Sequence, residues 1–171
     1  MTENTNSTAD QTVGIADDLS GKYLTFKLGE EDYGLEILKV QEIIKMMGIT
    51  RVPRTPEFVR GVINLRGKVI PVIDIRQKFR MEVVDETEKT CIIVVQVILG
   101  DVTVTMGLVV DEVSEVLDIV SENIEPSPEM GTSVDSNFIL GMAKSGDRVK
   151  ILLDVDKVMS ESEVRDLGKI S

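Results

Sequence analysis

The amino-acid sequence predicts a mainly β protein that consists of two related halves. Of its 171 residues 42% are hydrophobic but only 4% are aromatic, with no Trp, so any core must consist of Val, Ile and Leu. Branched aliphatic side chains of this kind favour pleated sheets over long helical bundles. Runs with apolar residues at alternate positions recur along the chain, and the second half repeats the order of motifs in the first.

The internal repeat emerges when the chain is aligned with itself. A shift of 73 residues superimposes one block of glycine and apolar residues on another: Gly34, Leu35, Val40 and Ile44 on Gly107, Leu108, Val113 and Leu117. A shift of 80 residues superimposes a second block: Phe58, Gly61, Val69 and Asp74 on Phe138, Gly141, Val149 and Asp154. Because the order is preserved, we expect a duplicated unit of about 65 residues, the size of a small SH3-like barrel.

The first elements can be taken in chain order. Residues 1–21 are small, polar and acidic, which is typical of a disordered tail. The segment "YLTFKL" at 23–28 alternates as a half-buried strand does, "GEED" turns the chain, and "YGLEI" returns as a second strand. A stripe of apolar residues with helical spacing then predicts a short helix over about Lys39–Met46. Its members are Ile37, Val40, Ile44 and Met47.

The later elements set the domain organisation. Asp74 and Asp154 follow the last strand of each half, and we expect each to cap a short helix. The two subdomains are expected at about 22–85 and 86–160, with end strands able to cross between them. Residues 161–171 are expected to form a C-terminal helix or tail.

The stretch "GVINLRGKVIPVIDI" at 61–75 predicts a β-hairpin with Arg66 at or near its turn. Asn64 and Gly67 suit the positive φ angles of a tight turn. The guanidinium is expected to meet a carboxylate, for which Glu42 is a candidate, and this pairing alone would explain Arg66. The alternative is a contact patch for a partner, which an exposed Leu65 beside Arg66 would favour.

Several function classes are disfavoured by composition. The chain has no His and a single Cys, Cys91, so the commonest acid–base residue and thiolate metal sites are missing. Adjacent acids such as Asp85–Glu86 and Asp111–Glu112 are expected to be solvated, so neither catalysis nor a cofactor is expected. A net charge of -11 disfavours nucleic acid as a partner. Without a signal segment or a long apolar run, the chain is expected to be cytoplasmic and not to insert into a membrane.

Charge is distributed unevenly along the chain. Residues 45–80 contain nine Lys or Arg against two acids, whereas residues 81–143 contain one lysine against 13 acids. Each run alone could be a solvated face. Their opposition within one small chain favours head-to-tail contact with a similarly polarised partner.

Four motifs together resemble the CheW family of chemotaxis coupling proteins. They are "YGLEILKVQEII", "PEFVRGVINLRGKVIPVIDIRQKF", "MGLVVDEVSEVLDI" and "DRVKILLDVDKV", and the likeness covers about residues 22–160. The resemblance implies two SH3-like five-stranded barrels around a shared hydrophobic core, with a few short helices. The N-terminal tail and the segment "GMAKSGDR" at 141–148 depart from the family pattern.

The resemblance also implies a function. It implies a non-catalytic adaptor that links the cytoplasmic tip of methyl-accepting chemoreceptors to the histidine kinase CheA, in arrays beneath the membrane. Receptor contacts are then expected at the positions that match the family's motifs: Val40, Glu42, Gly61, Asn64, Leu65 and Arg66. A contact with the regulatory domain of CheA is expected at Glu129 and Met130, in "EPSPEM". A coupler of another receptor–kinase pathway, for surface motility or development, would have the same sequence features.

Overall fold

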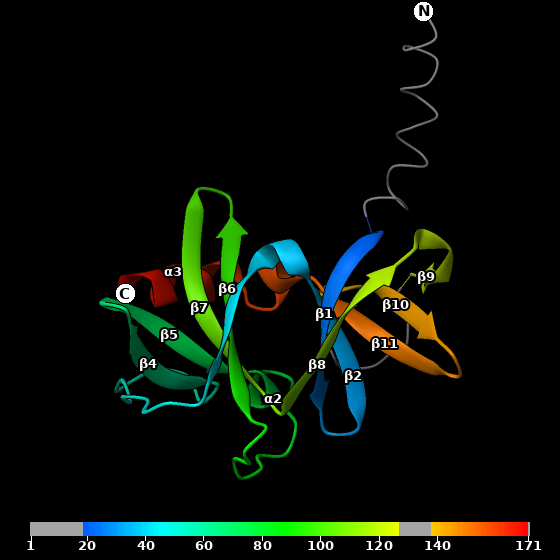
Figure 1. Ribbon diagram of the computed structural model, residues 1–171. Coiled ribbons are helices and arrows are strands. Elements are labelled where there is room, and N and C mark those ends of the chain that lie inside the picture. The colour runs from blue at the N-terminus through cyan, green and yellow to red at the C-terminus, as the bar shows by residue number, and fades with distance from the viewer. Residues whose placement is uncertain (1–18, 127–137, 171) are drawn as a thin grey trace, which may run out of the picture.

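The computed structural model describes residues 19–126 and 138–170, and its strands form two sheets (Figure 1). Sheet A has the strand order β8-β1-β2-β11-β10-β9, and sheet B has the order β3-β6-β7-β5-β4. The strands of sheet A are β1 (Gly21–Leu28), β2 (Glu31–Glu36), β8 (Glu112–Ile119), β9 (Ile124–Glu125), β10 (Ile139–Ser145) and β11 (Arg148–Leu153). Those of sheet B are β3 (Val40–Lys45), β4 (Val59–Leu65), β5 (Lys68–Asp74), β6 (Cys91–Leu99) and β7 (Val102–Val110).

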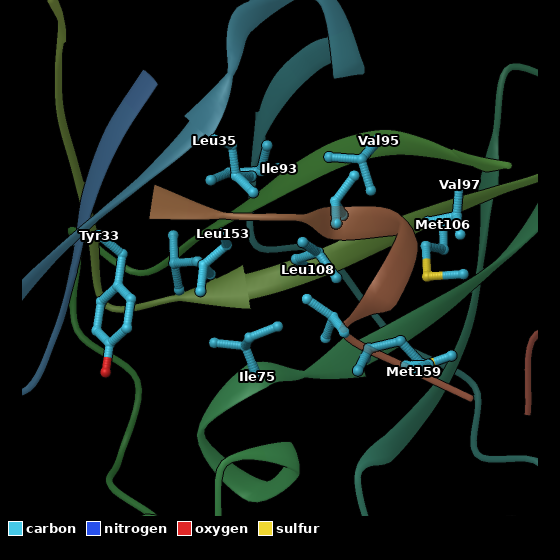
Figure 2. Close-up of a cluster of buried hydrophobic side chains, with 14 of the residues drawn as sticks. Tyr33, Leu35, Ile75, Ile93, Val95, Val97, Met106, Leu108, Leu153 and Met159 are labelled. Atoms are coloured by element: carbon cyan, nitrogen blue, oxygen red, sulfur yellow. The ribbon is translucent and has the colours of Figure 1, made fainter. Parts of the chain in front are cut away.

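Three apolar clusters show that each sheet curls around an interior of its own. The largest lies between the two sheets and includes Leu35 and Leu153 of sheet A and Ile93 and Leu108 of sheet B (Figure 2). A second lies within sheet B and a third within sheet A, around Leu152. The expected fold of two half-barrels around a shared core is therefore confirmed.

The first strand differs from its prediction in one respect, because β1 is buried on both faces. Leu24 and Phe26 point into the shared core, as the alternation predicts. Tyr23 and Thr25, on the opposite face, are also only 1% exposed. Tyr23 belongs to the cluster inside sheet A, so the strand separates two cores and is not half-exposed.

The two sheets do not divide the chain near residue 85. Sheet A combines β1 and β2 of the first half with β8 to β11 of the second, and sheet B combines β6 and β7 with β3 to β5. The exchange is joined by two parallel strand pairs, in which Val72 lies opposite Gly107 and Leu152 opposite Gly34. The shifts of 80 and 73 residues convert one pair into the other. The predicted duplication is thus present in the strand pairing, although the strands of each half are shared between both barrels.

The predicted helix over Lys39–Met46 is wrong. The 3-10 helix η1 occupies only Ile37–Lys39, and β3 follows as an edge strand paired with β6. The register shifts between Val40 and Glu42, so one extra residue interrupts the period of two. That bulge gives the apolar residues a spacing that resembles a helical one.

Short helices follow the last strand of each half, as predicted. The helix α2 (Ile75–Lys78) is capped by Asp74, whose carboxylate accepts a hydrogen bond from the Arg76 amide at 3.0 Å. The 3-10 helix η3 (Val155–Lys157) is capped by Asp154 in the same way. Another 3-10 turn, η2 (Ser121–Asn123), precedes β9. Of the two alternatives for the C-terminus, a helix is present as α3 (Glu161–Ile170).

The helix α3 packs onto the shared core between the sheets. Val164 and Leu167 of this helix are buried there. Its first turn is closed by a capping box, in which the amides of Ser160 and Glu163 donate to each other's side chains. None of the helices in residues 19–126 and 138–170 is long and apolar enough to cross a membrane.

Candidate functional site

The candidate site is the tip of the hairpin formed by β4 and β5. Leu65 pairs with Lys68, so the turn between them has only two residues, Arg66 and Gly67. Their φ angles are 51° and 86°, the positive values that a type I′ turn needs at both central positions. The Asn64 side chain accepts a hydrogen bond from the Gly67 amide at 2.9 Å, which supports the turn. The predicted position of Arg66 at a hairpin turn is confirmed.

Arg66 forms an ion pair with Glu42, as the sequence suggested. Its Nη2 atom donates to one carboxylate oxygen of Glu42, which lies in β3 opposite Val94 of β6. The side chain of Arg66 is 70% exposed, whereas that of Glu42 is 28% exposed. The pair therefore holds the guanidinium at the surface and leaves most of it in water.

Other residues predicted for this site are less accessible. Leu65 is half-buried and packs against the cluster inside sheet B, so the prediction of an exposed leucine beside Arg66 is wrong. Val40 is also half-buried and packs against the core between the sheets. Gly61 is buried in β4. Of the six residues assigned to receptor contact, Asn64 and Arg66 are the two that are exposed.

Two exposed apolar residues near Glu42 were not predicted. Leu38, in η1, is 96% exposed, and Ile43, the residue after Glu42, is 45% exposed. A signal for both was present in the sequence, since neither belongs to the apolar stripe assigned to residues 37–47. An apolar side chain at 96% exposure contributes little to any core and fits a surface that is covered by a partner.

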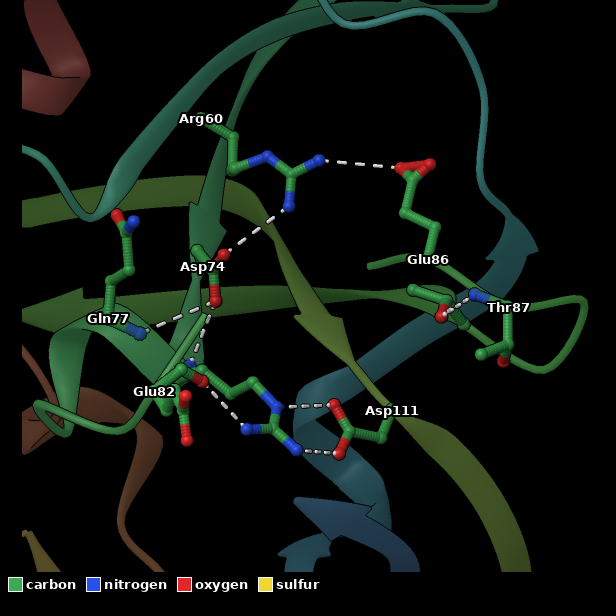
Figure 3. A network of polar contacts seen from close by, with 9 residues as sticks. Arg60, Asp74, Gln77, Glu82, Glu86, Thr87 and Asp111 are labelled. Atoms are coloured by element: carbon green, nitrogen blue, oxygen red, sulfur yellow. Dashed lines mark hydrogen bonds and ion pairs between the residues drawn. The ribbon is translucent and has the colours of Figure 1, made fainter. Parts of the chain in front are cut away.

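Part of the unequal charge is neutralised inside the molecule (Figure 3). Arg76 donates to both carboxylate oxygens of Asp111, at 2.8 Å and 2.5 Å, and to the Glu82 carbonyl oxygen at 2.8 Å. Burial acts to raise the pKa of Asp111, but the hydrogen bonds from Arg76 and from the Gly29 amide outweigh it and lower the pKa. Asp111 is therefore a structural ion-pair partner and not a solvated member of an acid pair.

Exposed charges remain on both sheets after these pairs are formed. On or near sheet B the exposed basic residues are Lys45, Arg51, Arg54, Lys68 and Arg80. On sheet A and its η2 turn the exposed acidic residues are Glu115, Asp118, Glu122 and Glu125. Glu129 and Met130, which the sequence assigned to the kinase contact, lie outside the described residues.

Neither chemistry nor a deep cavity marks the Arg66 site. A hollow of about 330 Å³ lies between residues 52–59 and α3, and another of about 420 Å³ is lined by polar residues that include Arg60 and Glu86. Neither hollow includes Arg66 or Glu42. Among the described residues, no group of three or more His, Cys, Asp or Glu is placed to hold a metal ion. This arrangement suits recognition of another protein at an exposed surface.

Comparisons with known proteins agree with this description. A family model described as CheW-like domain matches residues 22–163. The chemotaxis protein CheW of Klebsiella aerogenes is 41% identical over 156 residues, which cover 91% of this chain and 88% of that protein. CheW of Bacillus subtilis is 33% identical over 150 residues, which cover 85% and 93%. The crystal structure of the scaffolding protein TtCheW from Thermoanaerobacter tengcongensis has a TM-score of 0.74 and 39% identity, and covers 85% of this chain and 96% of that one.

Proposed function

The chain belongs to the CheW family of chemotaxis coupling adaptors, and from this premise we propose that it joins chemoreceptors to the histidine kinase CheA without catalysing a reaction. Its place is the cytoplasm, at the membrane-distal tips of the receptors. The family membership carries the adaptor function. The geometry of the Arg66 site and the division of charge support the assignment of the two partner surfaces.

Arg66 is the residue that we assign to receptor contact, and conformational energy supports the assignment. A residue with a side chain in the left-handed region costs about 1 kcal/mol, and Asn or Gly would lower that cost. An exposed ion pair such as that with Glu42 contributes about 0 to 1 kcal/mol. An arginine at this turn therefore contributes little to folding. A binding role explains why arginine occupies a position where asparagine would fold at least as well.

The test replaces Arg66 with the residue that the turn prefers. Arg66→Asn is expected to leave the thermal midpoint unchanged or slightly higher, and to weaken co-sedimentation with receptor cytoplasmic fragments at least tenfold. Arg54→Asn is a matched control, because Arg54 is also exposed and has a φ of 64°. Retained receptor binding in Arg66→Asn, or an equal loss in Arg54→Asn, would contradict the assignment.

The acidic second half is the surface that we assign to the kinase. Glu129 and Met130 lie in its "EPSPEM" segment, and the opposed charge of the two halves favours a partner with the same polarity. Met130→Asp and Glu129→Lys are expected to weaken binding to the CheA regulatory domain in a titration, and to leave receptor binding intact. Unchanged kinase affinity in both variants would move the contact to another surface.

A further inference from the structure

Sheet B is closed by a short contact that lies outside its regular strands. After β3 ends at Lys45, the chain crosses to the other edge of the sheet, where Thr50 pairs with Val62 of β4. The Thr50 amide donates to the Val62 carbonyl at 2.9 Å, and the Val62 amide donates back to Thr50 at 2.8 Å. Because β3 and β4 are the two ends of the strand order, this contact joins one edge of the sheet to the other.

Gly61 makes this contact possible. It lies at the bulge in β4, where the register with β5 shifts between Val59 and Gly61, and its φ is 141°. A Cβ atom at this position would lie 2.1 Å from the Thr50 carbonyl oxygen and 2.7 Å from its carbonyl carbon. Backbone atoms cannot move aside as the end of a flexible side chain can, so residues other than glycine would push the crossing segment away.

The same device closes sheet A at the positions related by the internal repeat. There β9 pairs with β10, with Glu125 opposite Met142, and Met142 is the residue 80 positions after Val62. A Cβ atom on Gly141, 80 positions after Gly61, would lie 2.9 Å from the Glu125 carbonyl oxygen. Closure through a bulge glycine is therefore part of the duplicated unit.

The two closures differ in what they carry. In sheet B the closing segment joins β3, which bears Glu42, to β4, which leads into the turn with Arg66. In sheet A the positions equivalent to Glu42 and Arg66 are Glu115 and Gly146, so no corresponding ion pair is possible. We infer that Gly61 and Thr50 are positioning residues for the Arg66 contact. They do not touch the partner but fix the distance between the strand that holds the carboxylate and the turn that holds the guanidinium.

This inference rests on the proposed receptor contact of Arg66, and the test compares the two equivalent glycines. Gly61→Ala and Gly141→Ala are each expected to lower the thermal midpoint. Gly61→Ala is expected to speed hydrogen exchange of the Val62 amide and to weaken receptor-fragment binding at least tenfold. Gly141→Ala is expected to bind the receptor fragment within twofold of the unsubstituted protein. Equal losses of binding in the two variants would show a general effect of stability and overturn the inference.

A milder pair of variants keeps the test decisive where Gly61→Ala does not fold. Thr50→Pro removes the amide that donates to Val62 and leaves Gly61 in place, and Glu125→Pro is its equivalent in sheet A. Thr50→Pro is expected to weaken receptor binding and Glu125→Pro to leave it unchanged. Binding that survives in Thr50→Pro, while Arg66→Asn abolishes it, would refute the positioning role alone. Binding that survives in Arg66→Asn would refute the proposed contact itself.

Discussion

At the scale of single residues, ion pairs in this molecule divide into those that support the fold and those that do not. Arg76 and Asp111 have side chains that are 12% and 26% exposed, and they join α2 to the chain between β7 and β8. Lys22 and Asp118 form a pair of similar length, 3.0 Å, but their side chains are 60% and 72% exposed. Because water screens the second pair, only the first is expected to contribute measurably to stability.

Asp111→Asn tests this difference and its dependence on pH. The substitution leaves the guanidinium of Arg76 without its carboxylate, so we expect the free energy of unfolding to fall by about 2 kcal/mol at pH 7. The pKa of Asp111 is lower in the folded state, so its contribution is present above the ordinary carboxyl pKa of about 4 and is lost as the pH falls further. Denaturant unfolding at pH 7 and pH 3 measures both effects.

The control for this prediction is Asp118→Asn. It is expected to change the free energy of unfolding by less than about 1 kcal/mol at either pH, because its pair is exposed. The difference between the unsubstituted protein and Asp111→Asn is expected to shrink at pH 3. A difference that grows on acidification would contradict the assignment of Asp111 as a stabilising carboxylate.

At the scale of elements, sequence patterns predicted what depends on neighbouring residues. The hairpin of β4 and β5, the Arg66 turn and the caps at Asp74 and Asp154 all follow from contacts within a few residues. The strand β3 was missed because its bulge interrupts the alternation. The burial of Leu65 was missed for a related reason, since it depends on residues of β6 that are distant in the sequence.

The element η1 carries the next prediction, because the repeat relates it to the Arg76–Asp111 pair. Leu38 corresponds to Asp111 and Asp156 to Arg76, but Asp156 binds Lys39 at 2.6 Å, which leaves Leu38 without an equivalent contact. Leu38→Ser is therefore expected to change the free energy of unfolding by less than about 0.5 kcal/mol. Under the proposed function, it is expected to weaken receptor-fragment binding, because Leu38 lies close in the chain to Glu42. Destabilisation in a denaturant titration, or unchanged receptor binding, would contradict this role.

At the scale of the whole molecule, the exchange of strands couples the two barrels. Each sheet contains strands from both halves, and the parallel pairs between β5 and β7 and between β2 and β11 join them. The sequence repeat predicted the duplication, but it could not show which half supplies each strand, since both arrangements bury the same alternating residues. One consequence is that the basic and the acidic surfaces belong to a single folding unit and keep a fixed relation to each other.

The fixed relation of these two surfaces leads to a prediction on salt dependence. If the chain docks between oppositely charged surfaces, raising the salt concentration from about 0.05 M to about 0.3 M shortens the screening length and is expected to weaken the complex with receptor fragments and CheA several-fold. The double variant Lys45→Gln and Lys68→Gln removes two exposed charges near the Arg66 site, so its binding is expected to be weaker at low salt and less sensitive to salt. Co-sedimentation at both salt concentrations measures these effects. A complex of the unsubstituted protein that is equally stable at both concentrations would mean that apolar contacts such as that of Leu38, and not charge, orient the adaptor between its partners.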